Sequence, residues 1–173
     1  MNETLKVLKE RRSIRSYKPE QITDAELNAI LEAGSYAASG MNRQSAVMVV
    51  IQDKALISRL NTINAEIKGM PGTNQFYGAP TVIAVLADAS TPTWFQDGVL
   101  VMGNLMNAAA AVGVGSCWIH RCEQTFERED CKDLLEAWGL NENYRGIAFC
   151  ILGYAEGDIP AAKPRKENYI RRA

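Results

Sequence analysis

The stretch from Gln96 to Val112 restricts the possible folds of this chain more than any other part of the sequence. It has helical length, and its large apolar residues recur on every side of a helix instead of along one stripe. These residues are Val99, Leu100, Val101, Met102, Leu105, Met106 and Val112. We therefore expect this helix at the centre of a domain or of a dimer. Gly98, Gly103 and the alanines at 108–111 would let another backbone approach closely in either case.

Shorter patterned segments around this helix indicate an α+β fold. Helices are expected at 2–10, 23–38, 54–66 and 127–138, and strands at 47–52, 81–87, about 116–120 and 146–154. Thr23 followed by Glu26 predicts an N-cap with a capping box. The unbroken apolar run at 81–87 is typical of a strand buried on both faces. The sequence thus predicts one domain, residues 1–173, with a mixed sheet flanked by helices.

The composition is that of an ordinary compact enzyme and argues against several other classes of protein. Hydrophobic residues make up 47% of the chain, and the formal net charge is −1. Such a balance gives no general attraction to nucleic acid or to an anionic membrane. The first residues lack the basic and apolar regions of a signal peptide, and no run approaches the roughly 18 apolar residues of a membrane helix. We therefore expect a cytoplasmic protein with no nucleic-acid or membrane partner.

The four cysteines are expected to be free thiols. Cys117, Cys122, Cys131 and Cys150 form no Cys-x-x-Cys pair, and a single histidine makes a zinc site hard to assemble. No metal is expected. A thiol nucleophile built from Cys117 and His120 is also disfavoured, because residues three apart on a strand point to opposite faces.

The basic run Arg11-Arg12-Ser13-Ile14-Arg15 is a candidate anion site. In an extended segment Arg11, Ser13 and Arg15 would point the same way, and two guanidiniums with a hydroxyl can hold a phosphate. The span also reaches a second electron-rich group about 6–7 Å away at the usual rise of a strand. A basic stretch solvating the end of a surface helix fits the same residues equally well.

A second pair of cations, Lys163 and Arg165, flanks Pro164 near the other end of the chain. Pro164 biases Lys163 toward an extended conformation, so both charges would lie on one side. A solvated terminal tail is the ordinary alternative. Two familiar nucleotide sites are excluded, because Gly113-x-Gly115 follows a helix and lacks the third glycine of a Rossmann motif, and no P-loop sequence occurs.

Five blocks in this order resemble the nitroreductase family of FMN-dependent NAD(P)H oxidoreductases, in its small single-domain form. They are Arg-Arg-Ser-Ile-Arg-Ser-Tyr at 11–17, Ser-Gly-Met-Asn-Arg-Gln at 39–44, Tyr-Gly-Ala-Pro-Thr-Val-Ile at 77–83, Gly-Val-Gly-Ser-Cys-Trp-Ile at 113–119 and Lys-Pro-Arg at 163–165. The resemblance covers essentially the whole chain. It implies a nitroreductase-like fold and a homodimer with one FMN at each interface.

The resemblance also implies roles for the cations. Arg11 and Ser13 would contact the FMN phosphate together with Lys163 and Arg165, and Arg12 belongs to the same cofactor-binding motif. Several cations suit a phosphate that carries nearly two negative charges. Arg15 would lie beside the N1/O2 edge of the ring system, where a cation stabilises the charge that reduction places there. It would therefore tune the flavin without being a catalytic acid or base.

Further cofactor-binding residues follow from the other blocks. The resemblance places Asn42 and Gln44 near the ring or the ribityl chain, although the same two residues also fit ordinary turn chemistry. It places the backbone of Trp118, Ile119, His120 and Arg121 along the N5/O4 edge, with a purely structural histidine as the alternative for His120. Asn74 is a further cofactor-binding candidate, in the loop of variable length before Tyr77.

The implied reaction is a ping-pong transfer in which NADH or NADPH reduces the flavin and a nitroaromatic, quinone or similar small acceptor reoxidises it. No metal and no catalytic side chain are expected, since the cofactor carries the chemistry. No motif indicates a choice between NADH and NADPH. Two alternatives stay open: an offshoot with another flavin reaction, such as reductive dehalogenation or flavin destruction, and a flavin-binding protein without catalysis.

Overall fold

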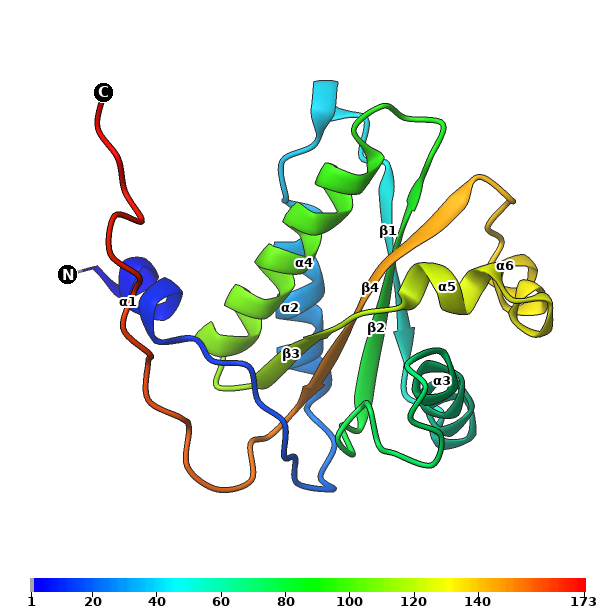
Figure 1. Ribbon diagram of the computed structural model, residues 1–173, viewed down its shortest axis with the longest axis horizontal. Helices are drawn as coiled ribbons and strands as arrows, with labels where there is room; N and C mark the ends of the chain where they lie inside the picture. Colours follow the sequence, from blue (N-terminus) through cyan, green and yellow to red (C-terminus); the bar gives the residue numbers. More distant parts are fainter. Residues whose placement is uncertain (1) are drawn as a thin grey trace.

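Four antiparallel strands form one sheet in the order β1-β2-β4-β3 (Figure 1). The computed structural model describes residues 2–173. The strands are β1 (Ala46–Ile51), β2 (Thr81–Asp88), β3 (Gly115–Ile119) and β4 (Tyr144–Gly153). The helices are α1 (Glu3–Glu10), α2 (Asp24–Ser35), α3 (Lys54–Ile67), α4 (Trp94–Ala111), α5 (Cys122–Glu127) and α6 (Lys132–Ala137), with 3-10 turns η1 (Gly40–Asn42) and η2 (Glu129–Cys131). The predicted α+β class is confirmed, and parallel pairing enters through a bridge between Ser13 and Ser116.

The sheet separates two apolar layers because side chains alternate along each strand. On β2, Val82, Ala84 and Leu86 face a layer formed with α3, α5 and α6. Ile83, Val85 and Ala87 face the opposite layer, which is formed with α2 and α4. Figure 1 shows these two groups of helices on opposite sides of the sheet. Residues 81–87 are all buried, as predicted, and each large side chain among them contributes about 1.5–3 kcal/mol relative to exposure.

The start of α2 follows the sequence signal, whereas the helix predicted for 127–138 does not form as a single helix. Thr23 caps α2 and forms the predicted capping box with Glu26, although α2 ends at Ser35 and not at residue 38. The single helix predicted for 127–138 is wrong, because α5 ends at Glu127 and η2 and α6 follow. The backbone of Arg128 is extended (φ −70°, ψ 138°). This break lets its guanidinium bind Glu66 at 2.9 Å and Asp130 at 2.8 Å.

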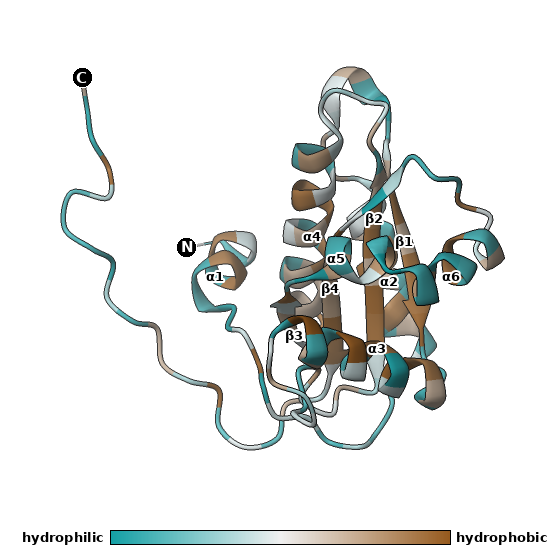
Figure 2. Ribbon diagram, turned by 45° about the vertical axis from the view of Figure 1, so that its right-hand side comes forward, coloured by the Kyte–Doolittle hydropathy of each residue, from teal (hydrophilic) through white to brown (hydrophobic). Residues whose placement is uncertain are grey.

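Helix α4 is covered on one side only within a single chain. Val101, Met102 and Leu105 are buried against the sheet layer, whereas Phe95 and Leu100 are 50% and 48% exposed. Figure 2 shows the hydrophobic colouring that runs along this helix. The expectation that α4 is buried on all sides is therefore met on its inner face, and its outer apolar face is open.

The chain after β4 runs as an extended tail past α1 and away from the sheet (Figures 1 and 2). Its beginning is tied down by a bridge between Tyr17 and Ala155 and by the Glu156 N–H, which donates to the Ser16 carbonyl at 3.0 Å. From residue 156 to 173 every residue is exposed. Among residues 2–173, no helix combines the length and hydropathy needed to cross a membrane.

Candidate functional site

Segment 11–17, from Arg11 to Tyr17, crosses the edge of β3 as an extended strand-like stretch. The Ile14 N–H donates to the Ser116 carbonyl at 2.9 Å. The Tyr17 hydroxyl donates to the Ile14 carbonyl at 2.8 Å, and both of these side chains are buried. Two apolar anchors therefore fix the segment, and its polar side chains are left to form a surface beside β3.

Arg11, Ser13 and Arg15 all lie close enough to Cys117 to influence its thiol. Burial raises the pKa of the Cys117 thiol. The charge of Arg15, a hydrogen bond with Ser13, and the charge of Arg11 each oppose that rise. Three side chains that act on one sulfur atom share one region of space. The alternation of an extended segment predicts this arrangement, which gives the chain a local cationic patch within a balanced surface.

Polar atoms without partners mark the cavity beside this patch. Arg11 Nη1 and Ser116 Oγ are buried and have no hydrogen-bond partner among the described residues. Both residues line a cavity of about 250 Å³, closed by α1 and by Ala110 and Ala111 at the end of α4. Glu3 and Glu10 line its α1 wall. Because buried polar groups in proteins are normally paired, these atoms indicate a site for an acceptor-rich ligand.

Arg12 lies in the same basic run, but its side chain binds backbone carbonyls at the end of α1. Its Nη1 donates to the carbonyls of Lys9 and Arg11, at 2.9 and 2.6 Å, and so caps the end of α1. Its Nε is buried without a partner. Arg12 as a cofactor ligand therefore stays a prediction. Ser116 was missed from the sequence, because only the pairing of β3 with segment 11–17 brings it to Arg11.

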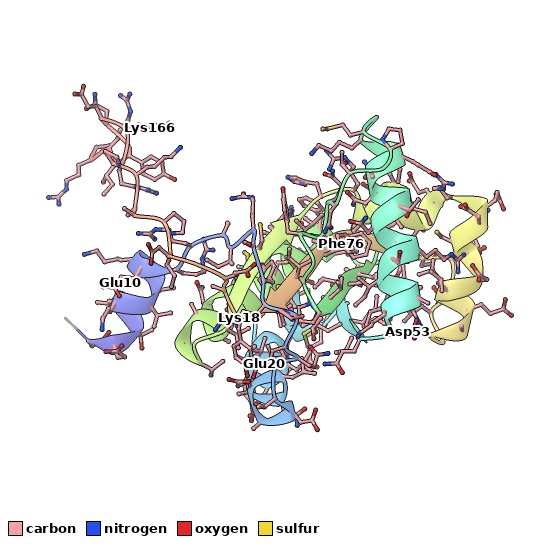
Figure 3. All side chains as sticks on the ribbon, turned by 90° about the horizontal axis from the view of Figure 1, so that it is seen from below. Glu10, Lys18, Glu20, Asp53, Phe76 and Lys166 are labelled. Carbon is pink, nitrogen blue, oxygen red and sulfur yellow. The ribbon has the colours of Figure 1, made fainter. Side chains whose placement is uncertain are left out.

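The structure does not bring Lys163 and Arg165 to Arg11 and Ser13. Both lie on the exposed tail, where Arg165 Nη2 donates to the Lys163 carbonyl at 2.7 Å. Figure 3 shows the neighbouring Lys166 beyond Glu10 of α1, far from Lys18 on the body of the protein. The four-cation cradle is thus not assembled within one chain as it stands.

Two buried polar side chains hold the backbone of the turn from β3 into α5, which includes residues 118–121. Asn64 of α3, which is wholly buried, donates to the His120 carbonyl at 2.7 Å. Thr125, also wholly buried, donates to the Arg121 carbonyl through its hydroxyl at 2.7 Å, and Arg121 is left-handed with φ 75°. The side chain of Ile119 is buried in the core, so its backbone is the part available to a ligand.

The imidazole of His120 is exposed and is oriented by its neighbour. Trp118 Nε1 donates to His120 Nδ1 at 3.3 Å, and the two rings meet edge to face. This donation leaves the proton of a neutral imidazole on Nε2. His120 is therefore ordered by contacts of its own, whatever its main chain does. Asn64 was missed from the sequence, because an asparagine inside a helix gives no sign of the carbonyl it will reach.

Asn74 lines a different cavity from Arg11. This cavity, of about 630 Å³, lies between α3 and the loop that follows it, and Gln21, Asn61 and Phe76 also line it. The same loop approaches the far end of segment 11–17, since Tyr77 and Arg15 both influence the pKa of Tyr17, which burial raises. Asn74 therefore lines a neighbouring cavity and not the one beside Arg11.

Asn42 and Gln44 lie on the segment that meets the first turn of α4, whereas Ala110 and Ala111 at its other end border the cavity with Arg11. Figure 1 shows this segment and segment 11–17 at opposite ends of α4. Asn42 and Gln44 belong to loop 39–45, Ser39 to Ser45, which packs against the start of α4 through Asp97. Gln44 Nε2 donates to Asn42 Oδ1 at 3.1 Å, and both side chains are exposed. The 18 residues of α4 span about 27 Å at 1.5 Å per residue. One chain cannot place this amide pair and the patch on one small ligand.

Comparison with known proteins identifies relatives of the whole chain. The family model described as "Nitroreductase family" matches residues 8–154. An FMN reductase [NAD(P)H] from Bacillus subtilis is 36% identical over 187 aligned residues, which cover 95% of this chain and 70% of the relative. The crystal structure of a nitroreductase with bound FMN from Bacteroides fragilis has a TM-score of 0.91 and 30% identity over all of both chains. A second nitroreductase with bound FMN, from Desulfitobacterium hafniense, has a TM-score of 0.88 and 29% identity, again over both whole chains.

Proposed function

The chain belongs to the nitroreductase family, and from this premise we propose that it is an FMN-dependent oxidoreductase. It takes hydride from NADH or NADPH and passes it to a nitroaromatic, a quinone or a similar small acceptor. The observation that carries the proposal is the cationic patch of Arg11, Ser13 and Arg15 with its unpaired Arg11 Nη1. When bound, FMN supplies the hydride chemistry, and the protein binds and orients it.

The patch fits the phosphate of FMN. Arg11 Nη1 and Ser116 Oγ are buried donors without partners, and a backbone bridge pairs Ser13 of segment 11–17 with Ser116. A phosphate offers several acceptor oxygens and nearly two negative charges, so it satisfies these donors and compensates the guanidinium. Lys163 and Arg165 would join this site only after the tail changes its position or meets a second copy of the chain.

Arg15 is proposed to tune the flavin. It lies further along segment 11–17 than the phosphate ligands and is exposed, so it can face the ring system. A fixed cation there stabilises the negative charge that develops on reduction. Arg15 therefore favours acceptance of hydride without exchanging a proton.

The turn at residues 120–121 is proposed to orient the reactive edge of the ring. Asn64 holds the His120 carbonyl toward the core. Because the peptide is planar and trans, the Arg121 N–H points the opposite way, out of the core. A backbone donor fixed in this manner can hold an acceptor atom of the ring edge in place. Neither Asn64 nor Arg121 needs to exchange a proton.

We further propose that two copies of the chain complete the site. The outer face of α4 exposes Phe95 and Leu100, and the tail exposes Ile159, Tyr169 and Ile170. A two-fold arrangement buries these surfaces and places loop 39–45 of one copy against the patch of the other. Asn42 and Gln44 then serve the FMN of the partner. The four cysteines of the described residues are free and buried, which suits a reducing cytoplasm.

The absorbance spectrum of the purified protein tests the cofactor. Oxidised flavin bands and released FMN are expected on chromatography, whereas FAD, or no flavin after reconstitution, would contradict the proposal. Steady-state oxidation of NADH and NADPH with a panel of acceptors then tests the activity. Turnover with nitroaromatics or quinones supports the reductase. Reaction only with halogenated substrates, loss of the flavin itself, or binding without turnover would indicate the alternatives raised from the sequence.

A further inference from the structure

Loop 39–45 holds an unusual amount of backbone strain for its length. Met41, Asn42 and Gln44 have positive φ angles of 53°, 55° and 50°. Residues other than glycine rarely adopt this left-handed region. Where they do, the surrounding structure has to hold the backbone in that conformation. Three in one short loop therefore call for an explanation in the contacts that hold it.

The carboxylate of Asp97 supplies those contacts. Asp97 is 2% exposed at the start of α4. Its Oδ1 accepts from the Gly40 N–H at 2.9 Å, and its Oδ2 accepts from Ser45 Oγ at 2.7 Å and from Thr93 Oγ1 at 3.1 Å. One buried side chain thus grips the loop near both of its ends. Burial would raise the pKa of Asp97, but the hydrogen bonds from Gly40, Ser45 and Thr93 together lower it, so the group is ionised.

The rest of the loop closes on this anchor. A Cβ at Gly40 would lie 2.3 Å from Thr93 Oγ1, so only glycine allows the loop to come this close to α4. Ser39 Oγ accepts from the Gln44 N–H at 3.1 Å across the loop. Gln44 Nε2 donates to Asn42 Oδ1, which leaves Gln44 Oε1 and Asn42 Nδ2 facing solvent as an acceptor beside a donor.

We infer that Asp97 is a positioning residue for FMN binding, because it holds loop 39–45 in the strained conformation that presents Asn42 and Gln44 as one preformed amide pair. This inference rests on the proposed function. Asp97 touches no ligand itself; it acts through the two amides. The strain is kept by Asp97 in the free protein, so FMN meets an ordered pair and does not have to order it.

A double-mutant cycle on the FMN dissociation constant tests the inference. Asp97→Ala should weaken FMN about tenfold or more, the range expected when a strained segment loses its support. In a chain that already carries Asn42→Ala and Gln44→Ala, the same Asp97→Ala change should have little further effect, because the groups it positions are gone. Equal losses in both backgrounds would show a general structural defect and would overturn the inference.

Three matched variants separate positioning from stability. Thr81→Val removes the partly buried hydrogen bonds that join Thr81, at the start of β2 and far from the loop, to Gln21 and Gln52, and it should leave the FMN affinity nearly unchanged. Asp97→Asn keeps an acceptor for the Gly40 N–H, and the two hydroxyls can rotate to accept from its amide, so it should restore most of the affinity. If Asp97→Ala fails to fold, Ser45→Ala, which removes one of the hydrogen bonds between the loop and Asp97, replaces it in the cycle with a smaller expected loss.

Trypsin provides a readout that needs no FMN. Arg43 lies exposed within the loop, so cleavage after it in the FMN-free protein reports how well the loop is held. Asp97→Ala should accelerate this cleavage and Thr81→Val should not; equal rates in the two variants would overturn the inference. A wild-type protein that binds no FMN would instead refute the proposed function, and the positioning role with it. FMN binding with additive losses refutes the positioning role alone.

Discussion

Segment 11–17 and loop 39–45 offer a ligand two different kinds of surface. Segment 11–17 has no left-handed residue, and Arg11 and the neighbouring Ser116 present buried polar atoms without partners. Loop 39–45 has three left-handed residues, and it is held by the buried carboxylate of Asp97 on α4, which accepts hydrogen bonds from Gly40, Ser45 and Thr93. Segment 11–17 thus borders polar atoms that lack hydrogen-bond partners, whereas the hydrogen bonds that hold loop 39–45 are already formed. On the proposed function, segment 11–17 would supply attraction for the cofactor, while loop 39–45 would supply a fixed shape.

The largest effect that separates the two regions is expected from Arg11→Ala. It should weaken FMN by up to about 3 kcal/mol, the loss of a charge-assisted hydrogen bond. The free energy of unfolding of the FMN-free protein should change by less than about 0.5 kcal/mol, because Arg11 Nη1 has no partner to lose. Fluorescence titration and urea unfolding measure the two quantities. Arg12→Ala, which removes the cap on α1, is the control and should lower stability more than affinity. The reverse pattern would contradict the assignment of these arginines.

Gly40→Ala should weaken FMN by about 2 kcal/mol for a steric reason, since the new Cβ would clash with Thr93 and displace the loop. Salt distinguishes this change from Arg11→Ala. Attraction between charges is screened, so Arg11→Ala should flatten the dependence of FMN affinity on ionic strength, and Gly40→Ala should leave it unchanged. Titrations at low and high salt would contradict the comparison if Gly40→Ala alone flattened the dependence.

Arg15→Ala should make the bound flavin harder to reduce. We expect its reduction potential to fall by about 30 mV, which in a two-electron couple corresponds to about 1.4 kcal/mol. The cation lost here stabilises the charge that reduction creates. Arg165→Ala should lower FMN affinity and leave the potential of the remaining bound flavin nearly unchanged. Redox titration of the two variants decides between them. A potential that moves with Arg165 and not with Arg15 would mean that the proposed orientation of FMN is reversed.

The smallest effect concerns pH. The folded-state pKa of Asp97 is lowered, so its contribution to stability is complete above the unfolded value, near 4, and is lost as the pH falls through the folded value. Between pH 7 and about 5 the difference in unfolding free energy between the wild type and Asp97→Asn should therefore stay constant, and it should shrink only in more acid solution. Urea unfolding across this range measures it. A difference that changes near pH 6 would indicate another group.

The sequence predicts what depends on neighbours along the chain and misses what depends on contacts across it. The Thr23 capping box, the buried strand at 81–87 and the common face of segment 11–17 follow from local rules. The break at Arg128 does not, because it depends on Glu66 from another helix. No local signal marks the roles of Ser116, Asn64 and Asp97, because each acts on a segment at least 50 residues away. Asp97 and Ser45, for example, are 52 residues apart in the sequence.

Mixed dimers test the central claim, that the patch of one copy and loop 39–45 of another form one FMN site. One chain carries Arg11→Ala and Ser13→Ala, and the other carries Asn42→Ala and Gln44→Ala. A mixed dimer then has one site with both defects and one intact site. Co-refolding equal amounts should restore about a quarter of the wild-type FMN sites and NAD(P)H oxidation, because about half of the dimers are mixed. Activity that never exceeds the mean of the two separate variants would contradict the claim.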